Sequence, residues 1–180
     1  SVRVTYTDDL KLISMRGEAQ LNSLADLQGE NITVKNYDYS KSYLNVKATH
    51  FTLIMNDKTK AELNAKSESV TLELSKNAEI KTLVTTQNLK LDLYQKTAAT
   101  LEGDVASAKI RLDNNSNLTA KKLTASDVEL VAESYSNVSI NALKNIKITA
   151  TGKSEIQLYG EPKIEMVKFT DTATLYKKMH

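Results

Sequence analysis

The segments 70–74 (VTLEL) and 89–93 (LKLDL) decide the fold, because both alternate apolar with polar residues over five positions. Strict alternation places the apolar side chains on one face of an extended chain and is typical of a half-buried β-strand. The apolar pair Leu72/Leu74 then recurs at Leu53/Met55, Leu91/Leu93, Ile110/Leu112, Leu130/Ala132 and Ile148/Ala150. The second members of these pairs lie 19, 19, 19, 20 and 18 residues apart, so the chain contains an internal repeat.

A second pair, apolar except for Thr82, follows the first pair in every repeat, and a third, looser apolar position follows the second. The second pairs are Ala61/Leu63, Ile80/Thr82, Ala99/Leu101, Leu118/Ala120, Val138/Ile140 and Ile156/Leu158. The third positions are Val84, Val105, Leu123, Leu143 and Ile164. A repeat of this length buries its apolar face only by stacking on its neighbours. We therefore predict an all-β, right-handed parallel β-helix (a β-solenoid), with about 19 residues and three short strands per coil.

The repeat divides the chain into three parts of a single predicted domain, residues 1–180. Residues 1–50 form irregular N-terminal coils, residues 51–162 the regular repeats, and residues 163–180 a capping strand over the last coil. Segment 15–28 is the best candidate for a helix, which is the minority interpretation for a chain dominated by strand patterns. Outward positions between the apolar pairs are mostly polar, as the exposed face of a sheet requires.

Composition excludes several classes of protein. The 180 residues contain 24 Lys and Arg against 22 Asp and Glu, so no basic excess indicates nucleic-acid binding. There is no Cys and there are two His, which argues against disulfides, thiolate–metal sites and His-rich metal sites, and we predict no cofactor. The sequence contains no apolar run of the roughly 20 residues that span a bilayer. Its first residues show no signal-peptide pattern, so we expect any targeting segment to have been removed or never present.

The stretch 137–164 (NVSINALKNIKITATGKSEIQLYGEPKI) carries a family resemblance. Its last coil, small-residue turn and closing step Tyr159-Gly160-Glu161-Pro162 resemble the C-terminal signature of the head GIN domain family of autotransporter-type adhesins, which is common in Bacteroidetes. The repeats from Phe51 onward are also similar, so the resemblance covers about two-thirds of the chain. It implies an extracytoplasmic protein of a Gram-negative bacterium, in the periplasm, the outer membrane or at the cell surface. No catalytic residues come with it.

Three tyrosines are the candidate binding residues. Tyr37 and Tyr39 would alternate on one side of a strand, and Tyr43 follows closely, so the rings could stack on a sugar or a protein partner. The polar neighbours that could bond such a ligand are Asn36, Asp38 and Ser40. In the alternative interpretation these rings cover the irregular N-terminal end of the core. Tyr94 and Tyr135 are expected near corners, as isolated surface rings.

The other chemistry-bearing residues have plain structural explanations. In the predicted stack, Glu73, Asp92 and Arg111 follow one another, and two carboxylates could act as acid and base on a polysaccharide. The alternative is a solvated ladder of charges. Asp8-Asp9 is expected in a turn, and neither His50 nor His180 has a recognisable metal-ligand partner.

From the sequence we therefore predict a non-enzymatic surface or periplasmic binding module, adhesin-like, that engages a glycan or a cell-surface protein and contains no catalytic site. The alternatives are a small pectinase-like enzyme and a lipid-associating envelope protein. The sequence does not define the oligomeric state.

Overall fold

The computed structural model describes residues 3–6 and 10–180, and within these residues it is built from strands and turns without a helix. The turn predicted at Asp8-Asp9 lies outside the described residues. The strands are β1 (Leu12–Met15), β2 (Gln20–Asn22), β3 (Leu27–Asn36), β4 (Lys41–Met55), β5 (Lys60–Ser75), β6 (Glu79–Tyr94), β7 (Ala98–Asp113), β8 (Asn117–Ala132), β9 (Asn137–Ala150), β10 (Glu155–Tyr159), β11 (Lys163–Phe169) and β12 (Thr174–Lys177).

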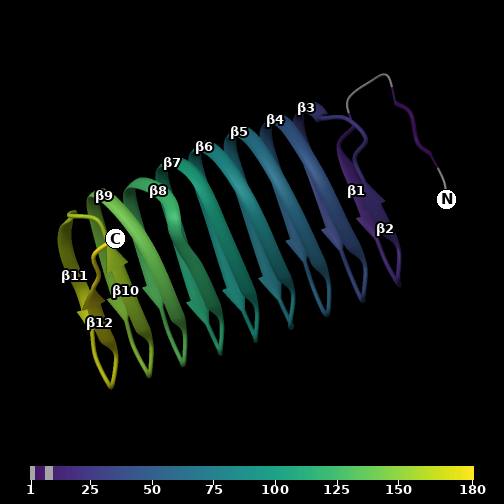
Figure 1. Cartoon of the computed structure of the whole chain (residues 1–180). Helices are drawn as coiled ribbons and strands as arrows, with labels where there is room; N and C mark the ends of the chain where they lie inside the picture. Colours follow the sequence, from purple (N-terminus) through teal and green to yellow (C-terminus); the bar gives the residue numbers. More distant parts are fainter. Residues whose placement is uncertain (1–2, 7–9) are drawn as a thin grey trace.

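The strands stack in parallel, one coil on the next, and form a β-solenoid of about nine turns (Figure 1). This confirms the predicted fold class. In the coils from β4 to β9 the three predicted stretches are merged into one continuous strand of 14 to 16 residues. The minority prediction of a helix over 15–28 is wrong, because this segment contains the end of β1, all of β2 and the start of β3.

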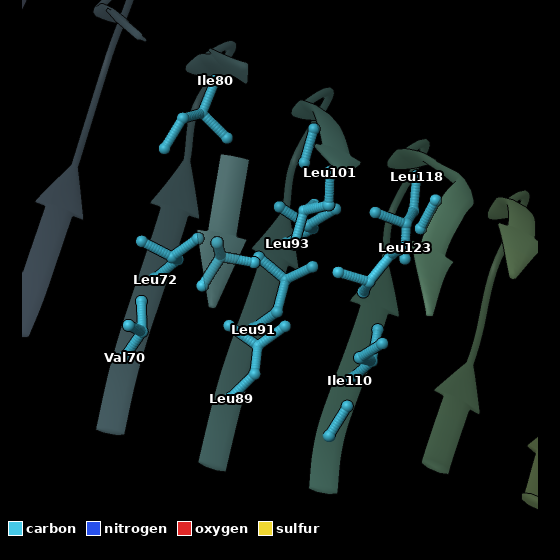
Figure 2. Close-up of a cluster of buried hydrophobic side chains, with 14 of the residues drawn as sticks. Val70, Leu72, Ile80, Leu89, Leu91, Leu93, Leu101, Ile110, Leu118 and Leu123 are labelled. Atoms are coloured by element: carbon cyan, nitrogen blue, oxygen red, sulfur yellow. The ribbon is translucent and has the colours of Figure 1, made fainter. Parts of the chain in front are cut away.

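The apolar pairs form continuous columns through the stack. Met55 pairs in register with Leu74, Leu74 with Leu93 and Leu93 with Leu112, and each of these side chains is at most 2% exposed. Figure 2 shows side chains of the neighbouring column, among them Leu72 and Leu91, gathered in the interior of successive coils. The predicted repeat offsets of 19, 20 and 18 residues are the register offsets between the coils. Burial of these columns is the main force that holds the solenoid together.

Two of the looser apolar positions were predicted wrongly as core. Leu143 is 48% exposed, because the β8–β9 register shifts and pairs Ala125 with Ala142, which takes the inward position instead. A shift of one residue turns a side chain to the opposite face of a strand. Ile164 does lie in an inward column, paired with Ile146, but no described coil lies beyond it, and it is 41% exposed.

The two ends of the solenoid depart from the regular repeat. At the N-terminal end the register offset is 21 residues, between Leu12 and Thr33. At the C-terminal end the tail forms the extended chain predicted for it, as β11 and β12. All seven residues of β11 are exposed, so the final coil leaves its own inward positions uncovered.

A column of small hydroxyl residues runs beside the apolar columns, two positions before the second pair of each coil. Its members are Ser40, Thr59, Thr97, Ser116, Ser136 and Ser154, each at most 1% exposed, with Ala78 in the same column. Thr97 Oγ1 lies 3.0 Å from Ser116 Oγ, which also donates to the carbonyl of Asp113 at 2.7 Å. The column comes directly after the turn between coils, and all its side chains are small.

Candidate binding edge

The tight turns between successive coils line one long edge of the solenoid, at the bottom of Figure 1. We call residues 37–39, 56–58, 75–77, 94–96, 113–115, 133–135 and 151–153 the turn edge. Each of these turns uses one or two residues with positive φ, such as Asp57 at 64°, Asn77 at 74° and Lys96 at 58°. Asn and Asp tolerate this left-handed backbone well, whereas other residues with a Cβ lose about 1–2 kcal/mol there. The turn edge is therefore the more strained part of each coil.

A shallow groove of about 680 Å³ follows the turn edge. Its lining comes from five successive turns: Asp38, Tyr39, Asp57, Lys58, Lys76, Asn77, Gln95, Lys96 and Asn114. Adjacent coils are about 4.8 Å apart, so the first and last of these turns are separated by about 19 Å along the solenoid axis. The groove is thus long, polar and parallel to the axis.

Tyr39 lies at the N-terminal end of the groove and is the one aromatic residue in its lining. Its side chain is 57% exposed, and Lys58 Nζ lies 5.8 Å from the centre of its ring. The ring thus presents an apolar surface next to amides and cations. This combination suits a sugar ring, whose C–H face stacks on aromatics while its hydroxyls bond to polar groups.

The two carboxylates of the groove stabilise the turns. Asp38 Oδ2 accepts a hydrogen bond from the backbone N–H of Gly17 at 2.7 Å, and Asp57 Oδ2 accepts one from the backbone N–H of Asp38 at 3.3 Å. Each carboxylate therefore binds the turn of the preceding coil. This arrangement gives both acids a structural role in the stack.

The predicted tyrosine group is divided by the structure. The prediction that Tyr37 and Tyr39 alternate on a strand is wrong, because β3 ends at Asn36 and the left-handed residue between the two rings, φ 63°, makes a turn. Tyr37 is half-buried beneath the guanidinium of Arg16, 4.4 Å from the ring centre. Tyr43 is 38% exposed on β4 and lines other grooves, beside Glu62. Tyr39 alone of the three lines the turn-edge groove.

Two of the expected hydrogen-bonding neighbours are in the interior. Asn36 and Ser40 have no exposed surface. The Asn36 amide donates to Ser42 Oγ at 2.7 Å, so it is occupied within the core. Neither residue can reach a ligand on the surface, and this part of the prediction is wrong.

The charge ladder lies on the strands, two positions before the turn edge, and none of its three residues lines the turn-edge groove. Glu73, Asp92 and Arg111 are register partners as predicted. Asp92 lies 3.8 Å from Lys90, and Arg111 lies 3.1 Å from Glu133. Both carboxylates of the ladder are half-buried, and both ion pairs are on the surface.

Both histidines have ordinary neighbours: His50 Nδ1 lies 2.7 Å from Ser69 Oγ, and the His180 ring is centred 5.1 Å from that of Tyr159. Within residues 3–6 and 10–180, no three His, Cys, Asp or Glu side chains are close enough to hold a metal ion.

Sequence comparison identifies the family. Residues 1–162 match the family described as "Putative auto-transporter adhesin, head GIN domain". The chain belongs to the head GIN domain family. This confirms the resemblance based on residues 137–164 and extends it into the irregular N-terminal coils; residues 163–180, which contain β11 and β12, lie beyond the match. A search of curated proteins and a search of solved structures gave no match to this head GIN domain. Nowhere in its described residues is there a helix long and apolar enough to cross a membrane.

Sequence reasoning did not single out most of the groove residues of this head GIN domain. Lys58, Gln95 and Lys96 were not distinguished from other surface residues. A usable signal was present, because these residues come one or two positions before the hydroxyl column in each repeat. Aligning the turns on that column, as well as the strands on the leucines, would have placed them on one edge.

Proposed function

We propose that this head GIN domain is a non-enzymatic, adhesin-like module that binds a glycan in the turn-edge groove. The observation that carries the proposal is the groove itself, which crosses five turns and has the exposed ring of Tyr39 at one end. The family name supports an adhesin role. A rigid stack of turns also suits recognition, because its side chains are held in place before the ligand arrives.

The groove favours a glycan over a protein partner. Protein interfaces are centred on clusters of apolar and aromatic residues. The lining of this groove has one ring, surrounded by amides, lysines and turn-bound carboxylates. Its chemistry is that of a hydroxyl-rich ligand.

We also propose that the module works outside the cytoplasm, in the periplasm, the outer membrane or at the cell surface, as its family name suggests. The pectinase-like alternative assigns acid and base roles to Glu73 and Asp92, whose register positions are adjacent. Incubation with pectin-type polymers and assay of reducing or unsaturated ends tests it. We expect no release, and release that is lost in Asp92→Ala would replace the binding proposal with an enzyme.

The test of binding compares two matched tyrosines on a glycan array. Tyr39 and Tyr176 are exposed to 57% and 47%, and each has a lysine near its ring, at 5.8 and 5.6 Å. Tyr176 lies on β12, away from the turn edge. We expect the intact protein to bind a subset of glycans, Tyr39→Ala to lose most of that binding, and Tyr176→Ala to keep it. Absence of any glycan binding, or equal loss in both variants, would refute the proposal.

A further inference from the structure

We infer that the ligand of the turn edge is an acidic polysaccharide, which lies extended along the solenoid axis and meets a line of lysines. This inference rests on the proposed function and specifies its ligand class. The net charge of +2 does not reveal the observation that supports this inference. On the turn edge the lysines are exposed, whereas the acidic residues are half-buried.

The outer rim of the turn edge is cationic. Lys58, Lys76, Lys96 and Lys153 are all exposed on it. No described acidic group lies within ion-pair distance of these four lysines, whereas five other surface cations of the chain do have such partners. Their ammonium groups are therefore available to an incoming anion.

The acids of the same edge are held further in. Asp38, Asp57, Asp113 and Glu133 are all half-buried. Asp38 and Asp57 accept backbone hydrogen bonds from neighbouring turns, and Glu133 pairs with Arg111. An anionic chain lying on the rim thus meets exposed ammonium groups first, whereas the carboxylates lie further in and three of the four already have partners.

The length and direction of the groove suit an extended ligand. Its lining crosses five turns, about 19 Å along the axis at 4.8 Å per coil, which exceeds the size of a single sugar. Two further tyrosines, Tyr94 and Tyr135, lie on the same edge and are 46% and 56% exposed. Lys153 Nζ lies 5.6 Å from the Tyr135 ring centre, which repeats the pairing of Lys58 with Tyr39. Both tyrosines are at corners, as predicted, but they share this edge with Tyr39 and are not isolated.

The experiment uses two pairs of polymers that differ in charge. Polygalacturonate is compared with its methyl-esterified form, and dextran sulfate with dextran, by calorimetry on the full chain at 50 and 300 mM NaCl. We expect the acidic member of at least one pair to bind about tenfold more tightly than its neutral counterpart at low salt, and high salt to reduce that difference, because salt screens exposed charges. Monosaccharides of the same type should compete poorly.

Matched lysine variants localise the effect. Lys76→Gln/Lys96→Gln should weaken binding of the acidic polymer about tenfold and reduce its salt dependence, whereas Lys144→Gln/Lys163→Gln, two exposed lysines away from the turn edge, should stay within about twofold of the unmodified protein. The variants' own unfolding curves show that the fold is intact.

Failure of this inference is separable from failure of the proposed function. Equal affinity for acidic and neutral polymers, or no binding of either acidic polymer, would overturn the inference. Loss of acidic-polymer binding in both double variants alike would also overturn it. The proposed function would still stand if the glycan array shows binding of neutral glycans that depends on Tyr39, and it falls with the inference if the array shows none.

Discussion

The strands and the turn edge of this solenoid follow different rules, although both are built from the same repeat. Along the strands a column keeps one kind of residue, as in the series Leu74, Leu93, Leu112, since each member packs on the next. Along the turn edge the same register position holds Asp57, then Lys76, then Gln95. The strands thus supply stability that is nearly uniform along the stack, and the turn edge is free to vary in chemistry.

The difference has an energetic side. Strand residues gain from burial and from parallel hydrogen bonds, whereas turn-edge residues such as Lys76 and Gln95 occupy left-handed backbone at φ 55° and 58°. Each such residue lowers the free energy of unfolding by about 1–2 kcal/mol relative to a residue without backbone strain at the same position. Three residues that are poor choices for the turn, Lys76, Gln95 and Lys96, have side chains that line the groove.

The largest effect is expected in an inward column. Leu91 is completely buried, so Leu91→Ala removes apolar contacts and leaves a cavity, at a cost of about 2–5 kcal/mol in the free energy of unfolding. The outward neighbour Asp92 should tolerate alanine within about 0.5 kcal/mol. Urea denaturation of both variants measures this. Similar losses in the two variants would contradict the columnar core.

Alanine substitution at two glycines compares the cost of steric crowding with the cost of backbone strain. Gly103 lies on β7 with φ +118°, and a Cβ there would sit 2.0 Å from the carbonyl oxygen of Val84. Gly17, in a turn, has φ +63° and open space around it. Gly103→Ala should cost at least about 3 kcal/mol and Gly17→Ala about 1 kcal/mol. Thermal unfolding distinguishes them, and an equal cost would mean that the strands do not pack as closely here as the register requires.

The fold could be predicted because its signal is repeated. Six pairs such as Leu72/Leu74 kept one phase, and no single error in reading them could change the period. The prediction was wrong where the period is locally broken. Leu143 follows a register shift between β8 and β9, and period-2 reasoning then assigns it to the wrong face.

The candidate site was harder to predict because it is made by stacking. Tyr39, Lys58 and Lys96 are far apart in sequence, and each looks like an ordinary surface residue in its own turn. Only the register of the turns brings them to one groove. The expectation for Tyr37 and Tyr39 was wrong for a local reason, since Asp38 takes a left-handed conformation that sequence alternation does not reveal.

The hydroxyl column, where strands and turns meet, should show an intermediate effect. Ser116→Ala removes bonds to Thr97 and to the carbonyl of Asp113 and should cost about 1–2 kcal/mol. The hydroxyl of Ser154 is buried without a partner among the described residues, so Ser154→Ala should be neutral or slightly stabilising. Ala78 already occupies this column without a hydroxyl. If urea midpoints showed a larger loss for Ser154→Ala, the hydroxyls would have to act through packing, not bonding.

The smallest expected effect is a substitution in the turn edge that raises stability and weakens binding. Lys96 has φ 58°, so Lys96→Gly relieves strain and, after the extra backbone entropy of glycine, should stabilise the protein by about 0.5–1 kcal/mol. On the strand β6, Lys81→Gly should instead destabilise it by about 0.5–1 kcal/mol. The Lys96 variant should also bind acidic polysaccharide more weakly. Unfolding and binding curves of one preparation test both effects. If Lys96→Gly lost stability as Lys81→Gly does, Lys96 would not be strained in this turn.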